Sequence, residues 1–136
     1  MRDPTLRRHF PRPSVAVANA YWRQRTLLGA GELSPRAVVR MRVGPEMVNG
    51  HAIAHGGLVF ALADTAFACA CNSYGPVTVA AGADVTFLRP ARAGDLLEAR
   101  AAERSASGRS GIYDVTVTRG GDVIAEFRGR SRAVRA

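Results

Sequence analysis

The sequence predicts an α+β fold in which an antiparallel sheet wraps around one long central helix. Residues 57–72 are almost all apolar, and their apolar groups occur at nearly every angle around a helix, so this helix should be buried on most sides. Residues 77–132 are typical of four β-strands separated by turns, and residues 37–43 of one more. An antiparallel sheet can cover one buried helix with one face and leave its other face exposed.

The first part of the chain differs from the rest. Residues 1–13 are charged and interrupted by proline, which indicates a loose arm, and residues 14–28 can form a short amphipathic helix with Ser14 as its N-cap. We therefore expect residues 1–30 to form an N-terminal arm and short helix, and residues 31–136 to form the main domain. With 136 residues in total, a single domain is expected overall.

The elements of the main domain follow from its periodicity and its turn residues. Residues 37–43 alternate in part, as a strand does, and Gly44-Pro45 closes that strand. Residues 46–55 should form a loop that leads into the long helix at 57–72. Stop signals follow the helix, with Gly75 as the expected C-cap position.

Glycine-rich turns divide the remaining chain into strands. Four strands are expected, at residues 77–88, 95–105, 112–118 and 122–132. The segment 95–105 could be helical by propensity, but the hairpins around it need a pairing partner, which favours a strand. Gly120-Gly121 predicts a tight hairpin before the last strand.

Asp64 interrupts the apolar helix. A carboxylate in the middle of a buried helix is costly unless it is paired or lies in a wetted cleft. Asp64 is therefore a candidate site residue.

Charge and composition narrow the possible partners. The net charge is +8, and the chain contains arginine but no lysine. Because guanidinium groups bind phosphates well, this charge favours an anionic partner, which could be a nucleic acid, a membrane surface or a phosphorylated small molecule. No nucleic-acid recognition motif, membrane span or secretory signal is present, so we expect no nucleic acid or membrane partner and a cytoplasmic location. Cys69 and Cys71 point to different sides of the helix and, without clustered histidines, predict no disulfide and no metal site.

A family resemblance rests on residues 49–66, which read NGHAIAHGGLVFALADTA. They resemble the signature of hotdog-fold acyl-CoA thioesterases, in particular the PaaI-type branch of hydroxyphenylacetyl-CoA thioesterases. The likeness covers about residues 35–132 and includes the stretches FLRP at 87–90, GIYDV at 111–115 and FRGRS at 127–131.

The resemblance implies a hotdog fold and a reaction. An enzyme of this branch hydrolyses (hydroxylated) phenylacetyl-CoA, or a similar aromatic acyl-CoA, to the free acid and coenzyme A during phenylacetate degradation. No cofactor is then expected, since the coenzyme A thioester is the substrate. Two alternatives stay open: a non-catalytic acyl-CoA-binding protein, and a thioesterase for short or medium aliphatic acyl-CoA.

The same residues suggest how the reaction is catalysed. Gly56 opens the helix, where backbone N–H groups lack intrahelical partners and favour a developing oxyanion. Asp64 lies eight residues further on, about 12 Å along a helix, so one thioester cannot touch both groups of one chain. Two helices packed antiparallel across a two-fold axis would bring Gly56 of one chain to Asp64 of the other. Asp64 then either attacks the thioester or activates water, and the sequence does not choose between these roles.

Other site residues follow from the resemblance or from local chemistry. The resemblance implies that Asn49 positions the thioester or the water, that His55 supports the carbonyl or the loop, and that the homodimer is the minimum active unit within a homotetramer. The residues expected to bind substrate are Gly57, Phe60, Thr65, Ala68, Arg89, Gly108 and Arg109. Among these, Ala68 leaves room for a bulky acyl group, and Arg89 and Arg109 are candidates for the coenzyme A phosphates.

Overall fold

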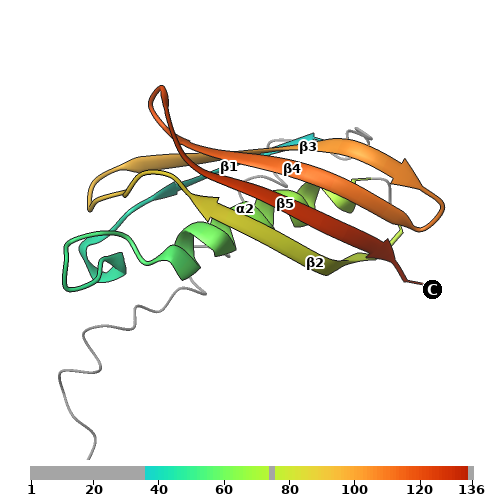
Figure 1. The fold of residues 1–136 in the computed structure, drawn as a ribbon, viewed down its shortest axis with the longest axis horizontal. Helices are drawn as coiled ribbons and strands as arrows, with labels where there is room; N and C mark the ends of the chain where they lie inside the picture. Colours follow the sequence, from blue (N-terminus) through green and yellow to red (C-terminus); the bar gives the residue numbers. More distant parts are fainter. Residues whose placement is uncertain (1–35, 74–75, 135–136) are drawn as a thin grey trace, which may run out of the picture.

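A five-stranded antiparallel sheet curves over one long helix (Figure 1). The computed structural model describes residues 36–73 and 76–134. The strands are β1 (Arg36–Arg42), β2 (Thr78–Phe87), β3 (Leu96–Ser107), β4 (Ser110–Arg119) and β5 (Asp122–Ala133), and they lie in the order β1-β3-β4-β5-β2. A 3-10 turn, η2 (Pro45–Met47), precedes the helix α2 (Gly56–Cys71). The predicted hotdog fold is confirmed, as is the choice of a strand over residues 95–105.

The core lies between α2 and the inner face of the sheet. Phe67 of α2 is almost fully buried, and its ring packs against the rings of Tyr113 on β4 and Phe127 on β5, with centroid distances of 5.5 and 5.9 Å. Gly129 on β5 makes room for it, because a Cβ at that position would lie 2.8 Å from the Phe67 ring. The helix is thereby fixed along the sheet, which sets the positions of the side chains on its other face.

The ends of α2 are defined by polar contacts. His55 is its N-cap residue and accepts the first hydrogen bonds of the helix on its carbonyl. At the other end the C-cap is Asn72, whose side-chain amide donates to the carbonyls of Ala68 and Thr78. The prediction that Gly75 caps the helix was therefore wrong, since the Asn72 side chain ties the helix end to the start of β2.

Two predictions lie outside the described residues: the arm at 1–13, and the helix at 14–28 with its N-cap Ser14. The boundary between residues 30 and 31 also lies there and stays a prediction. Neither of the described helices has the length and apolarity that a bilayer crossing requires.

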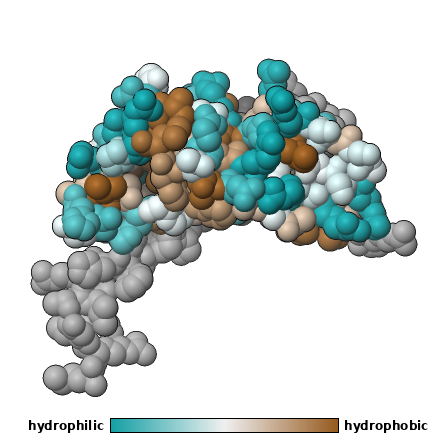
Figure 2. All heavy atoms as spheres, viewed as in Figure 1, coloured by the Kyte–Doolittle hydropathy of each residue, from teal (hydrophilic) through white to brown (hydrophobic). Residues whose placement is uncertain are grey.

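On the face seen in Figure 2, hydrophilic side chains are interspersed with apolar patches. Ion pairs such as Arg40–Glu98 and Arg128–Asp114 join neighbouring strands on the outer face of the sheet. The exposed large apolar residues are Val77, Val79, Phe87, Leu88, Leu96 and Val134. Val79 and Phe87 belong to β2, which is an edge strand and therefore has one unpaired side.

Candidate active site

A pocket of about 370 Å³ opens at the N-terminal end of α2. Its wall is formed by the loop residues Asn49, Ile53 and Ala54, the helix residues Gly56 and Val59, residues 87–91 at the end of β2 and directly after it, and Ile124 of β5. The pocket brings together three of the predicted site residues, Asn49, Gly56 and Arg89, although they are up to 40 positions apart in the chain.

Asn49 shapes the loop that leads into the helix. Its side-chain oxygen accepts hydrogen bonds from the backbone N–H groups of His51 (2.9 Å) and Ile53 (3.2 Å). Ala52, inside this loop, has a positive φ of 60°, which a tight turn requires. The oxygen of Asn49 thus closes the loop beside the pocket that Asn49 lines.

The N-terminal turn of α2 offers free backbone donors to the pocket. Gly56 and Gly57 are its first two residues, so their N–H groups have no carbonyl partner within the helix. Gly56 lines the pocket, whereas Gly57 is exposed beside it. A Cβ at Gly56 would meet the ring of Phe87 at 3.0 Å, so glycine is what lets the pocket wall approach the helix end.

His55 immediately precedes these donors. Its backbone N–H donates to the carbonyl of Met47 at 3.0 Å, which anchors the loop before the helix. Its imidazole Nε2 is buried and finds no hydrogen-bond partner within residues 36–73 and 76–134. A buried polar atom without a partner is costly, which makes this nitrogen available to a ligand or to a group from outside the described chain.

Asp64 lies near the middle of α2 and is half-buried. Burial raises the pKa of its carboxyl group above the ordinary value of 3.8. No hydrogen-bond partner for this carboxylate is present in the described part of the chain, and the hydroxyl of the adjacent Thr65 donates instead to the carbonyl of Ala61 at 2.7 Å. Asp64 is therefore an unpaired, partly desolvated carboxylate, the state that a functional acid or base often shows.

The side of α2 that carries Asp64 is not covered by the sheet. Phe60, Ala61 and Ala68 are half-buried like Asp64, and they lie at helical spacing from it along one stripe of the helix. The Phe60 ring packs against the Phe127 ring, with a distance of 5.3 Å between the ring centroids, so Phe60 is partly inside the core. Of the predicted substrate residues on α2, Phe60 and Ala68 border Asp64 on this stripe, whereas Thr65 is buried on the core side.

Comparisons with known proteins show the family of this chain. Residues 51–126 match the model of the thioesterase superfamily. The chain belongs to the thioesterase superfamily. It is 48% identical to the acyl-coenzyme A thioesterase PaaI of Escherichia coli over 99 residues, which are 72% of this chain and 71% of that protein. The predicted resemblance to PaaI-type hotdog thioesterases is thus confirmed.

Solved structures place this thioesterase in the same group. A structure of the E. coli PaaI protein from the phenylacetic acid degradation operon has a TM-score of 0.76 and 35% identity, with 88% of this chain and 97% of that chain covered. A mutant of the phenylacetic acid degradation protein PaaI from Thermus thermophilus gives a TM-score of 0.72 and 40% identity, with 74% and 87% covered.

The predicted coenzyme A contacts of the thioesterase lie at two ends of one protomer. Arg89 is at the pocket, where its Nη1 donates to the carbonyl of Val123 at 2.6 Å. Gly108 and Arg109 form the β3–β4 turn at the opposite end of the sheet (Figure 1). Ser110 pairs with Arg132 on β5, eight residues from Ile124 at the pocket, a separation of about 26 Å along a strand. One protomer does not bring Arg89 and Arg109 together.

Several pocket residues were missed from the sequence. Phe87, Leu88 and Ile124 line the pocket but were not predicted as site residues. The sequence did contain a signal for Phe87 and Leu88. They are two large apolar residues where a strand ends, directly before the candidate residue Arg89, and large apolar residues are unusual at an exposed strand end. Ile124 had none, since its neighbourhood depends on the pairing of β2 with β5.

Proposed function

We propose that this thioesterase hydrolyses the thioester of (hydroxylated) phenylacetyl-CoA, or a similar aromatic acyl-CoA, to the free acid and coenzyme A in phenylacetate degradation. The observation that carries the proposal is the pairing of two features on one helix. Free N–H donors face a pocket at its N-terminus, and a carboxylate with a raised pKa, unpaired within the described residues, lies on the stripe that the sheet does not cover. The substrate class is supported by the name of the E. coli relative and by the operon of the related structure.

The active unit in this proposal is a homodimer. Gly56 and Asp64 are separated by about 12 Å along one helix, too far for a single thioester carbonyl. In an antiparallel pair of helices, a two-fold axis near Phe60, midway between positions 56 and 64, sets Gly56 of each chain opposite Asp64 of the other. The half-buried stripe around Phe60 and Ala61 is the surface that such a partner would cover.

The edge strand β2 supports this assembly. Val79 and Phe87 are 46% and 51% exposed on a strand whose outer edge has no neighbour in the described sheet. Such an edge invites pairing with another strand. Pairing of β2 with β2 of a second copy would continue the sheet and place the two α2 helices side by side.

The chemistry in this site divides between the two chains. The N–H of Gly56 stabilises the oxyanion that forms on the thioester carbonyl, with the helix dipole behind it. The ionised Asp64 of the other chain either attacks the carbonyl carbon, giving a mixed anhydride that water cleaves, or takes a proton from water as it attacks. In both routes the thiolate of coenzyme A leaves, and the acyl group ends as a carboxylate. We propose that Asn49 and His55 orient the thioester and the loop, and that no cofactor takes part.

The same two-fold axis would bring Arg109 of one chain toward the pocket of the other. An antiparallel partner lays the far end of its sheet toward the pocket of the first chain, and that end carries the Gly108–Arg109 turn. We propose that Arg109 acts there, across the interface from Arg89, on the phosphates of coenzyme A. Since coenzyme A thioesters form inside the cell, the cytoplasm stays our prediction for its location, and the homotetramer stays our prediction for its assembly.

A panel of acyl-CoA thioesters tests the activity, with release of free thiol as the readout. Phenylacetyl-CoA and its hydroxylated forms should turn over faster than short and medium aliphatic thioesters, and Asp64→Asn should abolish turnover while the variant stays folded. Tight binding of acyl-CoA without turnover by the unmodified protein would instead indicate a non-catalytic binder. Preference for aliphatic thioesters would correct the substrate class, and activity that survives in Asp64→Asn would overturn the mechanism.

A further inference from the structure

Arg89 is held on two sides by neighbouring backbone. The N–H groups of Leu88 and Arg89 donate to the carbonyl of Ile124, at 2.8 and 3.2 Å. The Arg89 guanidinium donates to the carbonyl of Val123 at 2.6 Å. The position of this guanidinium therefore depends on two segments, the loop after β2 and the start of β5.

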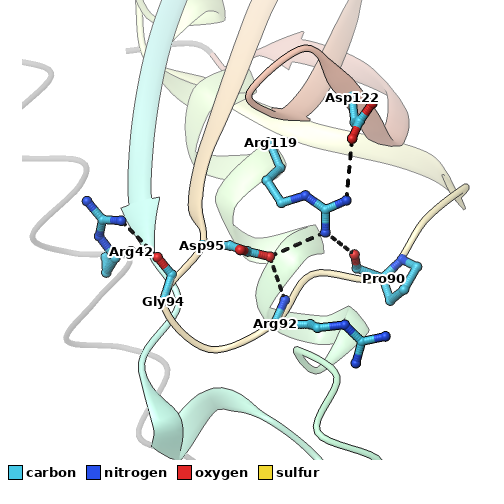
Figure 3. Close-up of polar contacts among 7 residues, drawn as sticks. All are labelled: Arg42, Pro90, Arg92, Gly94, Asp95, Arg119 and Asp122. Atoms are coloured by element: carbon cyan, nitrogen blue, oxygen red, sulfur yellow. Dashed lines mark hydrogen bonds and ion pairs between the residues drawn. The ribbon is translucent and has the colours of Figure 1, made fainter.

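Arg119, at the end of β4, contacts both of these segments (Figure 3). Its Nη1 donates to the carbonyl of Pro90, the residue after Arg89, at 2.7 Å. Its Nη2 lies 3.6 Å from the carboxylate of Asp122, the residue before Val123. One guanidinium thus holds the backbone carbonyl next to Arg89 and forms an ion pair with the side chain next to Val123, whose carbonyl holds the Arg89 guanidinium.

Asp95 keeps Arg119 in this place. Its carboxylate accepts from Nη1 of Arg119 at 3.3 Å and from the backbone N–H of Arg92 at 2.8 Å. These hydrogen bonds, the one from the Arg92 backbone first, hold the pKa of Asp95 below its ordinary value, so the carboxylate is ionised at neutral pH. The charge of Arg119 is engaged by Asp95 and Asp122, and Arg119 is not among the residues that line the pocket.

The other side of the pocket meets the segment after β2 in one hydrogen bond, from the N–H of Ala54 to the carbonyl of Ala91 at 2.7 Å, and its remaining hydrogen bonds do not involve Arg119. The segment before α2 is held by the hydrogen bond from His55 to Met47 and by the bridge between Val48 and Ala54. Loss of Arg119 would therefore loosen the wall that carries Arg89 and leave the helix donors at Gly56 in place.

We propose that Arg119 is a positioning residue for Arg89, and that it thereby tunes the affinity of the pocket for the nucleotide half of the coenzyme A thioester. The inference rests on the proposed role of Arg89 as a phosphate contact. Arg119 touches neither the acyl group nor the reacting atoms, so its loss should raise KM and leave kcat almost unchanged.

Two substrates with the same acyl group separate this role from a general structural one. One is the acyl-CoA, and the other is the acyl-pantetheine thioester, which lacks the nucleotide and its phosphates. Arg119→Met and Arg89→Met should each raise KM for the acyl-CoA by about tenfold, the effect of losing one charge-assisted hydrogen bond, without changing KM for acyl-pantetheine. Arg119→Lys should fall between, because one ammonium cannot reach Pro90, Asp95 and Asp122 together.

Arg128→Met is the matched control. Arg128 also joins two strands through an aspartate, Asp114, at 2.7 and 3.0 Å, but it has no contact with the pocket. This variant should leave both KM values unchanged. In the double variant of Arg119 and Arg89 the two losses should be less than multiplicative, because they act through one contact.

Three results would overturn the proposal: an equal effect of Arg119→Met on both substrates, no effect on either, or fully multiplicative losses in the double variant. An effect of Arg119→Met on acyl-CoA without one in Arg89→Met would equally contradict it. The Asp64→Asn variant tests the proposed catalytic site independently of these variants. Activity that survives in Asp64→Asn would refute the catalytic site but would not bear on Arg119.

Discussion

Gly56 and Phe87 are in contact across the mouth of the pocket, and a Cβ at Gly56 would come within 3.0 Å of the tip of the Phe87 ring. The contact joins the first residue of α2 to the last residue of β2. It places an aromatic side chain beside the first residue of the helix, whose N–H has no carbonyl partner within the helix.

Gly56→Pro tests the donor role of this N–H. Proline is tolerated at the first position of a helix, and His55 already has the extended backbone that precedes proline. The variant should therefore keep the helix but lose its donor, and kcat should fall by about 100-fold or more, as for removal of one oxyanion donor. Gly56→Ala is the control, because it adds the same Cβ beside Phe87 and keeps the N–H. If both variants lose the same activity, crowding against Phe87 explains the loss and the donor role is refuted.

The pH dependence of hydrolysis should report Asp64. The carboxylate must be ionised to attack or to accept a proton, so kcat/KM should rise with pH as Asp64 loses its proton. Because burial raises its pKa, this rise should lie above pH 3.8, the ordinary value for aspartate. A pH–rate profile with a good thioester substrate measures it. A rate that is already independent of pH at and below 3.8 would contradict an essential, half-buried carboxylate.

Asp64→Asn should be inactive but more stable than the unmodified protein at neutral pH. A carboxyl group whose pKa is higher in the folded state than in the unfolded state favours folding only when it is protonated. That contribution is present below the unfolded pKa and is lost as pH rises through the folded pKa. Asparagine avoids the loss, so the difference in thermal midpoint should be present at pH 7 and should shrink on acidification. A variant that is less stable at pH 7 would indicate a favourable partner for the ionised carboxylate.

Gly129→Ala should destabilise the protein without a specific effect on catalysis. The new methyl group would lie 2.8 Å from the ring of Phe67, which is locked between α2 and the sheet, so the cost should be about 1–3 kcal/mol in the free energy of unfolding. Denaturant titration measures this cost. Gly121→Ala, where no atom lies within 4 Å of the added Cβ, is the control and should change stability little. Equal stabilities of the two variants would show that the Phe67 ring can yield.

The elements of the described domain could be predicted from the sequence because their signals are local. The helix was predicted at 57–72 and is found at Gly56–Cys71, and the strand at 122–132 is found at Asp122–Ala133. Apolar periodicity and turn glycines encode such elements directly. The strand order was not predictable in this way, since the pairing of β2 with β5 joins residues about 40–55 positions apart.

The same distinction between local and long-range signals applies to the candidate site. Asn49, Gly56 and Asp64 lie in one contiguous motif, so the sequence revealed them together. Arg109 was expected at the nucleotide site, but the structure places it at the end of its own sheet that lies far from the pocket. The sequence of a single chain does not show which part of a partner chain lies beside that pocket. Arg119 had no sequence signal, since its contacts with Pro90 and Asp95 arise only from tertiary packing.

The central claim is that each active site takes Gly56 from one chain and Asp64 from the other, and mixing two inactive variants tests it most directly. Gly56→Pro and Asp64→Asn are purified alone and after co-expression, and hydrolysis is measured per chain. In a composite site, a mixed dimer contains one intact site and one doubly defective site, so random 1:1 mixing should restore about a quarter of the unmodified activity. If the mixed sample is no more active than the two variants alone, both residues act within one chain, and the proposed two-chain site is wrong.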